Sequence, residues 1–111
     1  MIIMISSQGN TLQSQPSLRF GRSPFYIKYN LSDDAWSAHK NEAVKESSGA
    51  GVAASQYIIN HQASTVLSGR FGPNAQRALS YSGIKMLTFD ETYETIQSVI
   101  DGYKSNRLKE F

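Results

Sequence analysis

Three short segments of the chain combine glycines, serine hydroxyls and arginines, and these are the residues whose types and spacing could do chemistry. They are residues 17–24, 47–51 and 68–74, and none of them contains a carboxylate. Glycine lets a backbone approach a ligand closely, and arginine offers a planar, permanently charged fork of hydrogen-bond donors. Together these groups are typical of a site that binds an anion or an anionic cofactor.

The predicted ligand contacts divide into charged side chains and backbone donors. Arg19, Arg22 and Arg70 would supply positive charge, and the amides of residues 49–51 and 72–74 would donate hydrogen bonds. The residues that we expect to bind the ligand are Ser17, Arg19, Phe20, Gly21, Arg22, Ser48, Gly49, Gly51, Arg70, Gly72 and Asn74. In the alternative interpretation, the glycines are only turn and cap residues and the arginines are only solvated surface charges.

Hydrophobic periodicity predicts five strands and three helices around these segments. The strands are expected at residues 1–5, 25–31, 35–41, 64–68 and 84–89. The helices are expected at residues 51–61, from Pro73 to a stop at Gly83, and from a cap at Asp90 to about Tyr103. Residues 105–111 form a charged tail that we expect to fray.

The resulting order, β-β-β-α-β-α-β-α, predicts one domain over residues 1–111 with an α/β fold. Strand–helix–strand crossovers require parallel strands, whereas the first three strands alternate in direction, so the expected five-stranded sheet is mixed. The long loop at residues 9–24 and the starts of the first two helices then meet at the carboxyl edge of the parallel strands. Ligands of open α/β sheets bind at this edge, and free amides at helix starts favour anions.

Length and composition exclude several classes of protein. The chain has 111 residues, the size of one domain, and contains no cysteine for disulfides, thiolate metal sites or nucleophiles. No apolar run approaches the ~20 residues of a membrane span, and the apolar start is too short for a signal peptide. We therefore expect a cytoplasmic protein without membrane contact. The net charge of +2 is too small to predict nucleic-acid binding.

The sequence also argues against catalysis. A nuclease that uses two metal ions needs carboxylates on the first strand, the first helix and the neighbouring strand, where this chain has none. Ser-His-Asp catalysis needs a histidine near the serine-rich edge. His61 is expected at the opposite edge, and only an extended third strand would bring His39 to the site. We therefore expect a binding protein and not an enzyme.

Three motifs follow one another along the chain. Residues 19–25 are Arg-Phe-Gly-Arg-Ser-Pro-Phe, residues 49–51 are Gly-Ala-Gly, and residues 69–75 are Gly-Arg-Phe-Gly-Pro-Asn-Ala. This series resembles the dinitrogenase iron–molybdenum cofactor-binding family, the NifX- and NafY-like proteins, and covers nearly the whole chain. The corresponding family segments are His-Phe-Gly-Arg-Ala-Pro-Phe, His-Gly-Ala-Gly and Gly-x-x-Gly-Pro-Asn-Ala. The resemblance implies a three-layer α/β/α fold like that of ribonuclease H, and binding of a metal cofactor or its precursors for nitrogen fixation.

Two positions depart from the pattern of that family. Arg19 and Ser48 stand where the family commonly has histidine. Histidine and cysteine are the usual protein ligands of iron, copper and molybdenum–sulfur clusters, so we expect charge and backbone amides to hold any cluster here. The resemblance implies an iron–molybdenum or molybdenum–sulfur cluster as ligand and cofactor-biosynthesis proteins as partners, and the residues themselves would also suit an oxyanion. The alternative is a protein-interaction or regulatory module that keeps the fold and has lost cluster binding.

Overall fold

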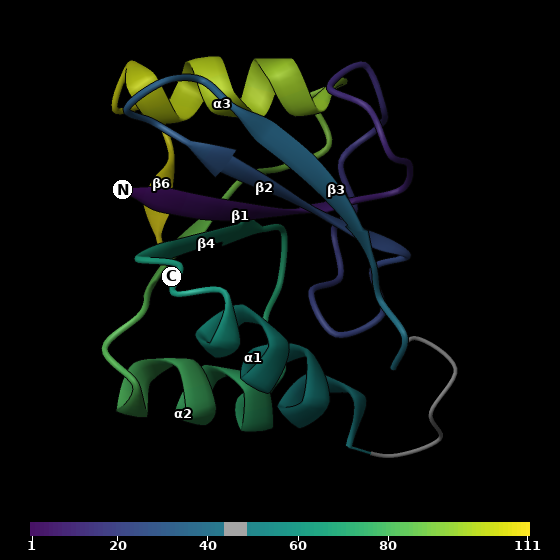
Figure 1. Ribbon diagram of the computed structural model, residues 1–111, viewed down its shortest axis with the longest axis vertical. Helices are drawn as coiled ribbons and strands as arrows, with labels where there is room; N and C mark the ends of the chain where they lie inside the picture. The colour runs from purple at the N-terminus through teal and green to yellow at the C-terminus, as the bar shows by residue number, and fades with distance from the viewer. Residues whose placement is uncertain (44–48) are drawn as a thin grey trace.

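The computed structural model of the protein describes residues 1–43 and 49–111 (Figure 1). In chain order, the elements are β1 (Ile2–Ser7), β2 (Phe25–Asn30), β3 (Trp36–Lys40), α1 (Ala50–Asn60), β4 (Thr65–Ser68), α2 (Pro73–Tyr81), β5 (Lys85–Thr88), α3 (Ile96–Lys104) and β6 (Lys109–Glu110). Among the described residues, no helix has the length and apolar character that a membrane crossing requires.

The strands form one mixed sheet in the spatial order β3-β2-β1-β4-β5-β6 (Figure 1). β1 pairs in parallel with β4, and β4 pairs in parallel with β5. β2 and β3 continue the sheet on one side in antiparallel fashion, and β6 closes the other side, antiparallel to β5. The α/β class, the mixed sheet and the directions of its first five strands agree with the prediction from the sequence.

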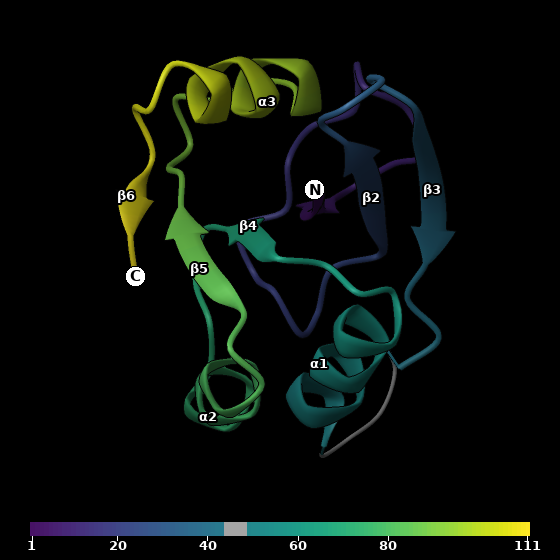
Figure 2. The ribbon, with the colours of Figure 1, turned by 60° about the vertical axis from the view of Figure 1, so that its left-hand side comes forward.

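Helices cover both faces of the sheet and make three layers (Figure 2). α1 and α2 lie on one face, and α3 lies on the other. Because side chains alternate between the faces of a strand, β1 contributes to both cores. Met4 belongs to the core beneath α1 and α2, whereas Ile3 and Ile5 belong to the core beneath α3. The central strand is therefore buried from both sides, which makes its carboxyl end a fixed platform for the loop that follows.

The sheet has six strands, so the predicted number of five is wrong. The additional strand, β6, lies in the tail that we expected to fray, and Lys109 pairs there with Thr88 of β5. The ring of Phe111 also contacts the ring of Phe71, with centroids 5.1 Å apart. Two paired residues show no alternation of polar and apolar side chains, so the sequence gives no sign of this strand.

The last helix begins later than predicted. The Asp90 carboxylate accepts a hydrogen bond of 3.0 Å from the backbone N–H of Thr92, which makes a local turn and caps no helix. α3 instead begins after Thr95, whose hydroxyl accepts a hydrogen bond of 3.0 Å from the backbone N–H of Ser98. The Ser98 hydroxyl lies 3.2 Å from the Thr95 N–H and completes a capping box.

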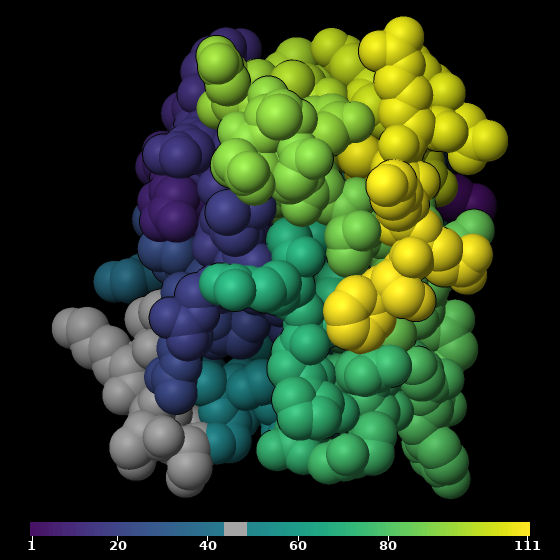
Figure 3. All heavy atoms as spheres, turned by 180° about the vertical axis from the view of Figure 1, so that it is seen from behind, coloured from purple at the N-terminus to yellow at the C-terminus, as the bar shows by residue number. Residues whose placement is uncertain are grey.

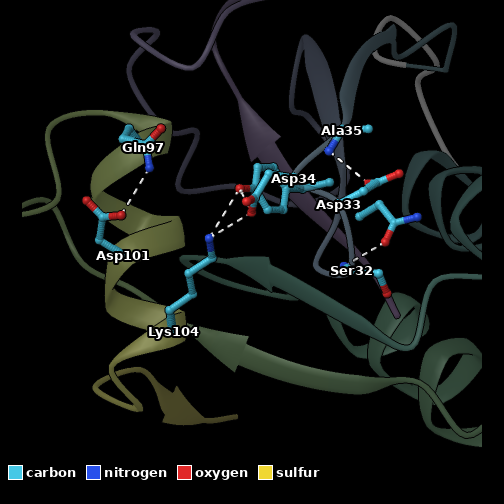
Figure 4. A network of polar contacts seen from close by, with 9 residues as sticks. Ser32, Asp33, Asp34, Ala35, Gln97, Asp101 and Lys104 are labelled. Carbon is cyan, nitrogen blue, oxygen red and sulfur yellow. Dashed lines mark hydrogen bonds and ion pairs between the residues drawn. The ribbon is translucent and has the colours of Figure 1, made fainter.

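A polar network joins α3 to the turn between β2 and β3 (Figure 4). The Lys104 ammonium lies 2.9 Å from the Asp34 carboxylate, and the Tyr29 hydroxyl donates to the same oxygen. The hydrogen bonds from Tyr29 and Lys104 lower the pKa of Asp34 from its ordinary value of 3.8. Both charged groups are exposed, so this contact is a surface link between the α3 layer and the sheet.

Candidate functional site

The loop between β1 and β2 is held against the end of β1 by serine hydroxyls. The Ser6 hydroxyl donates to the Ser17 carbonyl over 2.6 Å, and the Ser17 N–H donates to the Ser6 carbonyl over 3.0 Å. Farther along, the Ser23 hydroxyl accepts from the Ser7 N–H at 2.9 Å. All four serines are buried. The segment between these two attachments is therefore fixed at the carboxyl edge of the sheet.

Phe20 anchors the middle of this segment in the core. Its side chain is 1% exposed and packs between Tyr26 and Phe71, with ring centroids 5.5 and 5.3 Å away. The Tyr26 hydroxyl donates to the Phe20 carbonyl, and burial raises the pKa of Tyr26. Because Phe20 and Phe71 point inward, the residues beside them in sequence, which include two arginines, are left at the surface.

Close backbone contacts join the three predicted segments. Arg19 and Arg70 form a parallel bridge, in which the Phe20 N–H donates to the Arg70 carbonyl over 3.1 Å. A Cβ atom on Gly21 would lie 3.1 Å from the Cα of Gly51, so the loop lies directly against the first turn of α1. A Cβ atom on Gly51 would in turn lie 3.4 Å from the Cβ of Ala75 in α2. The glycines thus allow the segments to meet.

A cavity of about 400 Å³ lies where these segments meet. It is lined by Arg19, Phe20, Gly21, Arg22, Gly49, Ala50, Gly51, Arg70, Phe71, Gly72 and Ala75, which we call the arginine pocket. Figure 3 shows this face, where the blue atoms of the β1–β2 loop and the green atoms that follow β4 flank recessed teal atoms of α1. The convergence predicted from strand direction is therefore observed.

The electrostatics of the arginine pocket favour an anion. Three arginines line it, and the lining contains no carboxylate among the described residues. Both α1 and α2 begin at the pocket, at Gly49 and Gly72, with no acidic residue in the first turn. In the part of the chain that the structure describes, neither helix start has a side-chain cap. Backbone N–H groups of a first turn that lack such caps carry partial positive charge.

Most of the residues predicted as ligand contacts line the pocket, and among the described ones Ser17 and Asn74 do not. Ser17 is buried, and its hydroxyl is directed to the Arg19 carbonyl at 3.4 Å, so it supports the loop from below. Asn74 is exposed on α2, and its side-chain oxygen accepts from Arg77. Ser48 lies outside the described residues.

Two lining residues, Phe71 and Ala75, were not predicted as ligand contacts, and Ala50 was predicted only through its backbone amide. Phe71 stands between Arg70 and Gly72 in the sequence, so it could have been included by continuity. Ala75 gave no chemical signal, because an alanine on a helix is ordinarily a packing residue.

The two histidines of the chain are absent from the lining of the arginine pocket. The sequence places His39 in an edge strand and His61 at the end of the first helix and predicts no contact between them, but their rings lie side by side, with centroids 4.7 Å apart. β3 presents His39 on the face that α1 covers, and α1 ends at His61. This contact depends on tertiary packing between β3 and α1, for which the sequence pattern gives no signal.

Comparison with known proteins places this geometry in a family. Residues 1–106 match the model of the family described as dinitrogenase iron-molybdenum cofactor. The chain belongs to this family. The resemblance that the three motifs indicated is thereby confirmed, and this dinitrogenase-cofactor family is associated with cofactor binding and has no known catalytic role.

Two solved structures show how similar the folds are. The apo form of the orange protein from Desulfovibrio gigas matches with a TM-score of 0.93 and 25% identity, over 99% of this chain and 92% of that chain. A putative NifB protein from Thermotoga, of the DUF35 family, matches with a TM-score of 0.87 and 27% identity, over 98% of this chain and 91% of that chain. No curated protein gives a significant match. These likenesses confirm the α/β fold class.

Proposed function

We propose that this chain is a non-catalytic binding and carrier protein for an anionic metal cofactor of the iron–molybdenum or molybdenum–sulfur kind. The arginine pocket is the site, and the observation that carries the proposal is its charge. Three arginines and two helix starts face one cavity whose described lining has no carboxylate. In such a setting an anion gains both charge-assisted hydrogen bonds and the favourable ends of two helix dipoles.

The chemistry of the donor set fits a complete anionic cluster better than a bare metal ion. The described lining offers guanidinium groups and backbone amides, and it holds no imidazole, thiol or carboxylate that could ligate a metal. A cluster would therefore bind through its own sulfur or oxygen atoms, with Arg19, Arg22 and Arg70 as the charged contacts. This mode suits a carrier, because release requires no metal–protein bond to break. Cofactor-biosynthesis proteins of the cytoplasm would supply and receive the cluster.

A titration of the purified protein under anaerobic conditions tests the proposal. Tetrathiomolybdate, molybdate and an extracted iron–molybdenum cluster are the probes, and calorimetry and absorption spectra report binding. We expect tetrathiomolybdate or the cluster to bind, and the double substitution Arg22→Ala and Arg70→Ala to weaken that binding about tenfold or more. The melting temperature should change little, since Arg70 is exposed and Arg22 is not fully buried.

The matched control is Arg107→Ala, which removes an exposed arginine outside the arginine pocket. It should leave the affinity for the same probe unchanged. Equal affinities for the wild type and the double variant would show that the pocket is not the site. Failure of every probe to bind, together with tight self-association, would favour the interaction module instead.

A further inference from the structure

The only two histidines of this chain meet on the surface at the far end of α1 from the arginine pocket. His39 comes from β3, the strand at the edge of the sheet, and His61 is the residue at which α1 ends. Tyr57 completes the cluster, since its ring lies 4.5 Å from that of His61 and 6.0 Å from that of His39. Both imidazoles are only partly buried, so solvent reaches them.

We propose that His39 and His61 together bind one divalent transition-metal ion of the copper, nickel or zinc class. Neutral imidazole is the side chain that these metals share as a preferred ligand. This site would be separate from the arginine pocket and would not depend on the proposed carrier function. It would also join the edge of the sheet to the end of α1.

The spacing of the two rings fits a shared metal ion. A metal about 2.0–2.1 Å from an imidazole nitrogen lies about 3 Å from the centre of that ring. Two rings that meet at a metal with an angle of about 90–110° therefore have centres about 4.5–5 Å apart. The observed distance between the centroids of His39 and His61 is 4.7 Å. The separation of the two rings is therefore the one that a shared ion requires.

Ser37 orients the ring of His39 for this role. The Ser37 hydroxyl lies 2.7 Å from Nε2 of His39, and both residues are on the same face of β3. When Nε2–H donates to that hydroxyl, the lone pair of Nδ1 remains for a metal. A histidine that ligates a metal commonly donates its other N–H in this way, which fixes the ring and its tautomer.

Lys28 competes with the metal for His61. Its ammonium lies 3.2 Å from Nδ1 of His61, and an ammonium can only donate, so this nitrogen carries the lone pair in the observed arrangement. Coordination of a metal at either nitrogen of His61 requires that hydrogen bond to break. Lys28 is therefore an internal cation at the position where a metal would bind. Removing its charge should strengthen metal binding.

The remaining charges around the pair are balanced. His61 follows the last turn of α1, where the carbonyl end of the helix dipole favours a cation. Burial, and then the charge of the Glu42 carboxylate, raise the pKa of Tyr57, so a negative charge opposite in sign to Lys28 lies near the cluster. Within the described residues no group of three or more histidines and carboxylates converges. Water must therefore complete the coordination of the ion.

The test uses the untagged protein after dialysis against a chelator. Calorimetric titration with Cu²⁺, Ni²⁺ and Zn²⁺ should show saturable binding of one ion, and Mg²⁺ and Ca²⁺ should not bind, since they prefer oxygen ligands. Bound Cu²⁺ should show nitrogen hyperfine coupling in its electron paramagnetic resonance spectrum. Each single substitution, His39→Gln or His61→Gln, should abolish binding of this ion. Lys28→Met should increase the affinity for it.

Two controls distinguish loss of the metal site from loss of the fold. Circular dichroism and the melting temperature will show that each glutamine variant is folded, and tetrathiomolybdate affinity should remain that of the wild type in all three variants. Absence of saturable metal binding to the wild type would overturn the proposal. Binding that survives in either folded glutamine variant, or that weakens in Lys28→Met, would also overturn it.

Discussion

The two ends of α1 differ in almost every chemical respect, although one helix of 11 residues carries both. Its first turn lies against glycines and arginines in the arginine pocket. Its last turn presents Tyr57 and His61 to His39 of the edge strand. The N–H groups at the start of a helix favour anions and the carbonyl groups at its end favour cations. The polarity of the backbone thus agrees with the side chains at both ends.

The distance between the two ends of α1 would allow a small domain to hold two unlike ligands. The ends of α1 are separated by roughly 16 Å, since each helical residue adds roughly 1.5 Å. Ala54 and Ile58, between them, are buried against the sheet. Each end can therefore be changed without direct contact with the other. We expect the following substitutions and conditions to affect one end and spare the other.

The largest effect should come from Gly69→Ala, which acts on the arginine pocket. A Cβ atom at Gly69 would lie 2.7 Å from the Leu18 carbonyl oxygen and 2.8 Å from the Leu18 Cα. These are backbone atoms, so the bridge between Arg19 and Arg70 must shift. We expect unfolding free energy to fall by about 1–3 kcal/mol in denaturant titrations, as for other overpacked sites. Affinity for tetrathiomolybdate should fall as well.

Gly72→Ala is the matched control for that substitution. Gly72 lines the pocket itself, but outside its chain neighbours no atom lies within 4 Å of a Cβ built there, and its φ of −69° suits alanine. The unfolding free energy of the Gly72→Ala variant should fall by less than about 1 kcal/mol, since alanine caps a helix less well than glycine. Equal losses in the two variants would show that the close approach to Leu18 is not what holds the segments together. Nickel binding at the histidines should be the same in both.

The sequence predicted the arginine pocket well, because its position follows from topology. Strand directions put the ends of β1 and β4 at one edge. The loop after β1 carries Arg19 and Arg22, and Gly69 and Arg70 directly follow β4. Phe71 could have been included for the same reason, since it lies between Arg70 and Gly72. Ala75 could not, because its contact with Gly51 depends on how closely α1 and α2 pack. Whether these residues bind a ligand stays a prediction.

The histidine cluster could not be predicted from the sequence by the same reasoning. His39 and His61 belong to elements whose order and direction were predicted correctly, but their contact depends on how closely α1 packs against β3. That packing involves the side chains of the whole helix face, which local sequence patterns do not specify. β6 was missed for a related reason, since its pairing with β5 is a tertiary contact of only two residues.

Ionic strength should have a moderate effect on ligand affinity at the start of α1 and little effect at its end. The arginine pocket would bind its ligand through charge, so raising the ionic strength from about 0.05 M to about 0.5 M shortens the screening length and should weaken tetrathiomolybdate binding several-fold. Metal coordination by His39 and His61 is a short-range bond, and nickel affinity should change by less than about twofold. Calorimetry in sodium nitrate measures both. A similar salt dependence at the two ends would contradict the distinction between charge recognition and coordination.

The smallest effect should follow from Asp34→Asn, which lies away from both ends of α1. Asp34 has a φ of 60°, a conformation that asparagine tolerates, so the substitution removes charge without adding strain. The hydrogen bonds from Tyr29 and Lys104 lower the pKa of Asp34 below 3.8. Its contribution is therefore complete above pH 3.8 and is lost as the pH falls through the lowered value. The variant should have a slightly lower melting temperature than the wild type at neutral pH, and the difference should disappear in acid.

Asp33→Asn is the control, because the side-chain oxygen of Asp33 accepts only from the Ala35 N–H and meets no cation among the described residues (Figure 4). A melting difference for Asp34→Asn that persists at the lowest pH would mean that packing of the turn, and not the charge of Asp34, stabilises the contact with α3.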